Sequence, residues 1–139
     1  MAVRGVRAAG LATSLGRSGR RLLAGLALGD AELSVLLVSD AEMQRLNRDW
    51  RGKDRPTDVL AFAQGEGDGA APAGLLGDVV ISVDTARRQA RSGGRPLGRE
   101  AERLLVHGLL HLLGYDHERS ARAAAEMRQK ERELARWLR

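Results

Sequence analysis

The chain has 139 residues, of which 43% are hydrophobic, and a formal net charge of +5. This length suits one compact domain over residues 1–139, so we expect a single functional site. The absence of cysteine excludes disulfides and thiolate metal sites, and it leaves imidazole and carboxylate as the plausible ligands for a transition metal. No apolar run reaches the roughly 20 residues that cross a bilayer, so we expect a soluble protein of the reducing cytoplasm.

The positive charge is concentrated near the amino terminus. The first 29 residues hold five arginines and no acid, whereas the rest of the chain has equal numbers of basic and acidic residues. Such a start is also typical of an organelle transit peptide. The apolar pattern favours a folded segment instead: Val3 and Val6 fit a short strand, and leucines between residues 15 and 26 share one helical face. Its arginines fit a solvated face, with contact to a polyanion as the alternative.

The next segment predicts a strand followed by a helix. Residues 33–38 form a short, branched apolar run that is typical of a buried strand. Ser39 and Glu42 have the spacing of a capping box, so a helix should begin there and fade over residues 47–50. Glycine and proline within residues 51–58 then indicate an ordered turn.

The remaining pattern alternates strands, turns and helices without an internal repeat. We expect a strand at residues 59–62 and another at 77–83, which leads into a helix capped by Asp84. Between the two strands, residues 64–74 are small and glycine-rich, so we expect a mobile surface loop. Residues 118–139 mix alanine with alternating charges, which suits an amphipathic helix packed on the outside.

All three histidines of the chain lie in or just after the last turns of the long helix expected over residues 98–113. His107 and His111 are four residues apart, so their rings project from one face with Cβ atoms about 5 to 6 Å apart. Gly114 permits the left-handed turn that returns His117 to the same place. We therefore predict one zinc ion bound by His107, His111 and His117. Three histidines leave a fourth position open, which distinguishes a catalytic zinc from a structural one.

This spacing is also that of metzincin proteases, whose general base is a glutamate directly after the first histidine. The chain has Gly108 at that position, and glycine cannot take a proton from water. Peptide hydrolysis by the usual route is therefore not expected. Asp116 is the nearest acid in the sequence, and orienting a histidine is the role we weigh for it. The sequence does not identify the residue that acts as the general base.

Three segments resemble signatures of the YbeY family, bacterial endoribonucleases of ribosomal RNA maturation. The longest match lies at residues 107–117, which read HGLLHLLGYDH. Residues 47–60 and 76–82 resemble the other two signatures, and the resemblance covers nearly the whole chain in order and spacing. It implies a single-domain α+β fold, in which about five α-helices pack on a mixed sheet of about four strands. It also implies a metal site at the end of a core helix, held by the three histidines.

The resemblance further implies a zinc-dependent endoribonuclease, specific for single-stranded RNA, with one Zn²⁺ per chain. Such an enzyme acts in ribosomal RNA processing, at the 3′ end of 16S RNA, and in ribosome quality control in the cytoplasm. The expected partners are ribosomal RNA, the small ribosomal subunit and assembly factors, with no membrane and no small-molecule cofactor.

Arg51 and His107 are the catalytic candidates, and the family resemblance singles out Arg51. Zinc and a planar guanidinium both stabilise the extra negative charge of a phosphorane-like transition state. Lys53 could supply that cation instead. The alternative for these cations is a surface turn in which they pair with neighbouring aspartates.

Two other functions remain possible from the residues. One is a ribosome assembly factor with a structural zinc, which binds RNA without cutting it, and the other is a residual metalloprotease. Arginines at positions 87–99 could follow a phosphate backbone or form a solvated helix face. The chain has only four tryptophan, tyrosine and phenylalanine residues, so we expect weak sequence-specific base recognition.

Overall fold

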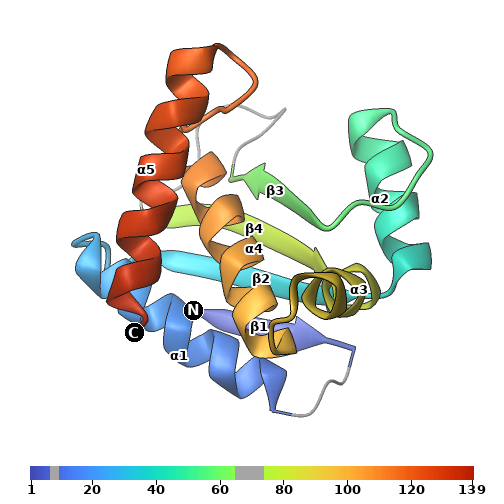
Figure 1. Cartoon of the computed structure of the whole chain (residues 1–139), viewed down its shortest axis with the longest axis horizontal. Coiled ribbons are helices and arrows are strands. Elements are labelled where there is room, and N and C mark those ends of the chain that lie inside the picture. Colours follow the sequence, from blue (N-terminus) through green and yellow to red (C-terminus); the bar gives the residue numbers. More distant parts are fainter. Residues whose placement is uncertain (7–9, 65–73) are drawn as a thin grey trace.

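The computed structural model describes residues 1–6, 10–64 and 74–139 (Figure 1). Within them, five helices surround a four-stranded mixed sheet, which confirms the expected α+β fold. The elements in chain order are β1 (Ala2–Gly5), α1 (Leu11–Gly25), β2 (Glu32–Val38), α2 (Asp40–Arg51), β3 (Val59–Ala63), β4 (Leu75–Ser82), α3 (Val83–Gly93), α4 (Leu97–Leu112) and α5 (Ala121–Trp137).

The sheet has the strand order β1-β2-β4-β3. β1, β2 and β4 run parallel, with Val35 opposite Val79, whereas β3 pairs antiparallel with β4. The amino-terminal segment is therefore part of the fold, because β1 pairs with β2 and α1 follows it. β3 lies at the edge of the sheet, and this edge forms one wall of the cleft at the three histidines.

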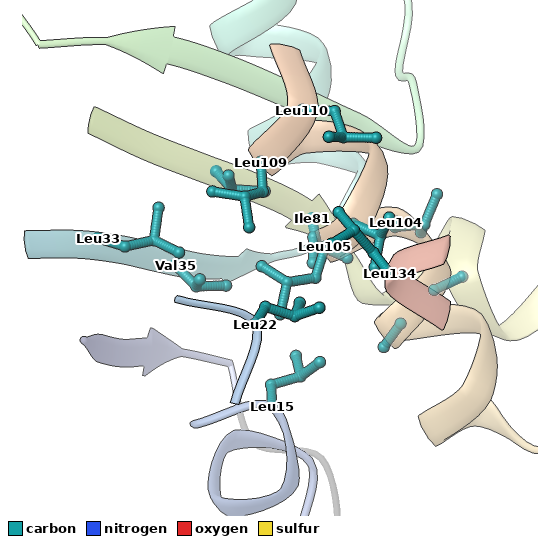
Figure 2. Packing of buried hydrophobic residues seen from close by; sticks show 14 of the residues in the cluster. Leu15, Leu22, Leu33, Val35, Ile81, Leu104, Leu105, Leu109, Leu110 and Leu134 are labelled. Atoms are coloured by element: carbon teal, nitrogen blue, oxygen red, sulfur yellow. The ribbon is translucent and has the colours of Figure 1, made fainter. Parts of the chain in front are cut away.

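The main core lies between one face of the sheet and helices α1, α4 and α5 (Figure 2). Alternate side chains of β2 and β4 point to this face, since Val35 and Ile81 are fully buried. α4 crosses in front of the strands and packs against the sheet on one side and against α1 and α5 on the other. Consequently Leu105 and Leu109, in the middle of α4, are completely buried.

The other face of the sheet is covered less completely by the described residues. α2 packs there with Met43, which is fully buried, beside Val38 and Val80. Trp50, near the end of α2, leaves 65% of its surface exposed. This face therefore has a small apolar cluster and an open margin.

Several expected boundaries differ from the structure. Val6 lies beyond β1 and is 42% exposed. The cap of α3 is Ser82, whose side chain accepts a hydrogen bond from the Thr85 amide at 3.2 Å. Asp84 instead accepts from the amide of Asp40, so a long-range contact takes the carboxylate that sequence reasoning assigned to the cap.

Two further expectations concern the loop and the last helix. The mobile loop predicted at residues 64–74 falls mostly on 65–73, which lie outside the described residues, and β4 begins directly after Gly74. The tail forms the expected amphipathic helix, and its residues Met127 and Leu134 are fully buried against the core. No helix in the described ranges is long and apolar enough to span a membrane.

The approach of α4 to the sheet depends on a glycine. A Cβ atom at Gly108 would lie 2.7 Å from a methyl carbon of Val79 and 3.3 Å from one of Val59. Real Cβ atoms essentially never approach another atom this closely, so any side chain at position 108 pushes the helix away from the strands. Gly108, which stands where a metzincin has its general base, is therefore also required for the packing of α4 against the sheet.

We expect the substitution Gly108→Ala to destabilise the protein by about 1–3 kcal/mol through overpacking, despite the gain in helix propensity. Gly98→Ala is the matched control, because it lies in the same helix with nothing within 4 Å of its added Cβ. That control should be neutral or stabilising by up to about 1 kcal/mol. Urea unfolding of both variants measures the difference, and equal stabilities would contradict this account of the packing.

Candidate metal centre

Three histidine side chains meet at the carboxyl end of α4. The ring centroids of His107 and His111 lie 4.9 Å apart, and that of His117 lies 5.3 Å and 5.4 Å from them. One ligand nitrogen from each ring lies within 4.8 Å of the others. Among the described residues, this triangle is a group compact enough to hold one metal ion, as the sequence spacing predicted.

The backbone after α4 returns His117 to the other two rings. Gly114 has a φ of 97°, in the left-handed region that favours glycine. The amide of Gly114 donates to the His111 carbonyl, and that of Tyr115 donates to the Leu110 carbonyl, each at 3.0 Å. These two bonds close the end of the helix, so the expected glycine turn is confirmed.

The surroundings of His111 favour its neutral imidazole form. Burial, and then the neighbouring rings of His107 and His117, lower the pKa of His111 from the ordinary histidine value of 6.5. A metal binds the neutral form of histidine, because the proton and the ion compete for the same nitrogen. The three-histidine donor set and the neutral form of His111 therefore both fit a metal of the imidazole-binding type, such as zinc.

Glu131 of α5 is a site residue that sequence reasoning missed. Its Oε2 atom lies 3.4 Å from Nδ1 of His107, and both side chains are about three-quarters buried. The hydrogen bond with His107 lowers the pKa of Glu131, although burial opposes that shift. Glu131 lies in the stripe formed by Met127 and Leu134, and an acid in an apolar stripe was the available signal.

A carboxylate on Nδ1 would leave Nε2 of His107 available to bind a metal ion and would increase the basicity of the ring. The sequence offers Asp116 for this orienting role. Its Oδ1 atom instead accepts a hydrogen bond from the Glu118 amide at 2.9 Å, which braces the turn that carries His117. The carboxylate in contact with His107 is that of Glu131.

The histidines open into a cleft of about 720 Å³ that also reaches the end of α2 and the edge strand β3. Its polar lining includes the three histidines together with Asn47, Arg51, Lys53, Arg55, Thr57, Asp58 and Glu118. Residues 47–60, which carried the second family signature, are thus brought to the histidines by the tertiary fold. Three of these lining residues, Arg51, Lys53 and Arg55, are cations, and two, Asp58 and Glu118, are acids.

Arg51 is the last residue of α2, whereas the sequence placed it in the following turn. Its Nη2 atom donates to the carbonyl of Ala61 at 2.8 Å. The guanidinium carbon lies 4.6 Å from the centroid of the Phe62 ring. These contacts hold Arg51 against the edge strand at the rim of the cleft.

The aspartates near the turn, which the sequence offered as partners for its cations, pair with other groups. Asp49 pairs with Arg48 at 3.0 Å, and Asp54 accepts from the Gln44 side chain. Asp58 accepts from the Val59 amide and from Gln89 Nε2. Asp58 therefore anchors the start of β3 to α3.

The arginines at positions 87–99 divide into two groups. Arg88 pairs with Asp40 at 2.7 Å, and Arg95 pairs with the fully buried Glu100 at 2.6 Å. Burial raises the pKa of Glu100, but hydrogen bonds from Arg103 and Arg95 outweigh it and hold the pKa below its ordinary value. Part of this basic segment is thus structural. All five arginines of the segment, Arg87, Arg88, Arg91, Arg95 and Arg99, are nevertheless exposed.

Comparisons with known proteins identify the family of this chain. A family model described as endoribonuclease YbeY matches residues 20–139. The chain belongs to that family. A relative from Anaeromyxobacter dehalogenans with the same name is 58% identical over 127 residues, which cover 86% of this chain and 64% of the relative. A relative from Geobacter metallireducens is 49% identical over 116 residues, covering 82% of this chain and 77% of the relative.

The chain thus spans less than two thirds of the Anaeromyxobacter YbeY relative. A solved structure supports the fold assignment independently. The solution structure of TM1509 from Thermotoga maritima matches with a TM-score of 0.65 and 28% sequence identity, over 97% of this chain and 87% of that one.

We expect Glu131→Gln to weaken zinc binding by about 10-fold or more, because the neutral amide no longer supports the ring of His107. Competition with a chromogenic zinc chelator measures the dissociation constant. Glu126→Gln is the matched control on the same helix, since Glu126 is exposed and pairs with the exposed Arg122. Equal zinc affinity in the Glu131 variant and the wild type would refute the role of Glu131.

The lowered pKa of His111 predicts an acid sensitivity of the metal-free protein. Unfolded His111 takes up a proton near pH 6.5, whereas the folded residue does so only at lower pH. Between these values the unfolded state binds more protons, so the free energy of unfolding falls as the pH falls below about 6.5. Urea unfolding in chelator at a series of pH values measures this slope. His111→Gln should make the slope shallower, and an unchanged slope would contradict the prediction.

Proposed function

We propose that the protein is a zinc-dependent endoribonuclease specific for single-stranded RNA. In this proposal it acts in the cytoplasm, in maturation of the 3′ end of 16S ribosomal RNA and in ribosome quality control. Its partners are ribosomal RNA, the small ribosomal subunit and assembly factors. The observation that carries the proposal is the histidine triangle opening into a cation-lined cleft of about 720 Å³. Membership of the endoribonuclease YbeY family supports the choice of substrate.

His107, His111 and His117 would hold the zinc through ring nitrogens, with Glu131 fixing the first of them. When bound, the ion supplies Lewis acidity, which polarises a phosphate oxygen or lowers the pKa of water. Arg51 presents a planar guanidinium to a phosphodiester lying in the cleft. Its hydrogen bond to Ala61 and its stacking on Phe62 orient that guanidinium before substrate binds.

Gly108 separates this chemistry from that of the proteases with the same histidine spacing. A glutamate at position 108 would meet the methyl groups of Val79 and Val59, because α4 lies against the strands there. The general base of a metzincin therefore has no room in this fold. A phosphodiester suits the cleft better than a peptide, since the cations that line it can neutralise phosphate charge.

A ribosome assembly factor with a structural zinc is the second candidate. Against it, 25% of the His107 side chain and 42% of the His117 side chain are exposed at the rim of the cleft. The hydrophobic core consists mainly of leucines and valines and includes neither His107 nor His117. A zinc at this rim is therefore expected to leave without unfolding the protein, which a structural zinc would not do.

Chelation separates the two functions. We expect a chelator to abolish cleavage of single-stranded RNA while the far-ultraviolet circular dichroism stays native, and added zinc to restore cleavage. His111→Ala should lose both zinc and cleavage. Arg51→Ala should keep zinc but cleave about 100-fold more slowly, because it loses one charge-stabilising group.

Elemental analysis and an RNA cleavage assay on the same preparations provide the measurements. Full cleavage by the zinc-free protein or by His111→Ala would rule out the catalytic proposal. Loss of the folded dichroism on chelation would favour the structural zinc of an assembly factor. Cleavage of casein would support a protease instead.

A further inference from the structure

Trp50 is an exposed aromatic side chain in a chain that has few aromatic residues. It lies near the end of α2 with 65% of its surface exposed. Its ring centroid lies 6.1 Å from that of Phe62, at an interplanar angle of 68°. The edge-to-face contact holds one edge of the indole, so a large part of the ring remains open to solvent.

Trp50 and Phe62 line a groove of about 280 Å³ on the sheet face opposite the main core. The floor of the groove is apolar, with Leu36, Leu46 and Val80. Its rim is polar, with Arg4, Ser34 and Asp78. The groove therefore combines flat apolar surface with a cation, a hydroxyl and a carboxylate.

The groove and the histidine cleft lie on the two sides of β3. Leu60 and Ala61 line the cleft, whereas Phe62 lines the groove. Arg51 connects them, since it lines the cleft while its guanidinium lies over the Phe62 ring at 4.6 Å. An RNA strand bound at the histidines can therefore pass over Arg51 and reach Trp50, because Arg51 contacts Phe62 and Phe62 contacts Trp50.

We propose that this groove binds one unpaired base of the RNA strand that occupies the cleft, stacked on the indole of Trp50. The inference rests on the proposed endoribonuclease function and adds a base-binding subsite to it. Every base presents a π-face, so stacking favours single-stranded RNA without reading its sequence. Ser34 and Asp78 offer hydrogen-bonding groups to the base edge, and Arg4 offers a cation to its phosphate.

The dimensions of the groove favour a base over a protein segment. Its volume lies just below the range of about 300–1,000 Å³ that is typical of drug-sized ligands, so a single ring system fits it better than a helix. Arg4 at the rim can pair with a phosphate of the RNA backbone, an interaction that a purely apolar partner does not offer.

The test compares Trp50→Ala with the wild type, both loaded with zinc, in binding to a fluorescein-labelled 2′-O-methyl oligoadenylate. The second ligand is the same oligomer without bases, which keeps the phosphates and removes the stacking. Fluorescence anisotropy gives the affinities. We expect Trp50→Ala to lose about 5- to 100-fold in affinity for oligoadenylate and nothing for the abasic oligomer. Trp50→Phe should retain most of the affinity.

Trp137→Phe provides a control and a reporter, because Trp137 packs beside Gly25, between α5 and α1. This variant should bind oligoadenylate as the wild type does, and its single tryptophan, Trp50, should be quenched by oligoadenylate but not by the abasic oligomer. Circular dichroism of Trp50→Ala should match that of the wild type, since the side chain is mostly exposed.

The outcomes separate the two levels of the hypothesis. If the wild type cleaves and binds RNA but Trp50→Ala binds equally well, the base subsite is rejected, the groove is left to a protein partner and the proposed function stands. An equal loss on both oligomers also rejects stacking, because it indicates a structural role for Trp50. If the wild type neither binds nor cleaves RNA, both proposals fail together.

Discussion

The contact between α4 and the sheet at Gly108 determines where the rest of the site can lie. At this position the helix backbone rests on the methyl groups of Val59 and Val79 without an intervening side chain. His107 directly precedes the contact and His111 lies one turn beyond it, so the depth of both rings relative to β3 is set by the packing. A larger residue would move the helix and with it the floor of the cleft.

Around this contact, segments that are far apart in the sequence each contribute one residue to the site. The turn at Gly114 returns His117, α5 contributes Glu131, and the end of α2 contributes Arg51. The edge position of β3 is essential to this arrangement, because an edge strand leaves its outer backbone groups available. The carbonyl of Ala61 uses that freedom to hold Arg51 in place.

Sequence reasoning recovered the parts of the site that local geometry specifies. The spacing of His107 and His111 on a helix, followed by a glycine turn, predicted the triangle that the structure contains. Glu131 was missed because its contact with His107 spans 24 positions, and no local pattern encodes which helices pack together. Similarly, Asp84 was expected to cap α3, but Ser82 caps it while Asp84 accepts a hydrogen bond from α2. Arg51 entered through the family resemblance, since its approach to Phe62 depends on how α2 meets β3.

The contact between Glu131 and His107 links the last helix to the metal centre. α5 is anchored by Met127 and Leu134, so the carboxylate reaches the imidazole only after this helix has docked on α4. During synthesis the three histidines leave the ribosome before Glu131 does. The centre therefore gains its supporting carboxylate after its histidines have emerged, and a nascent chain presents these histidines before it can hold them in their final orientation.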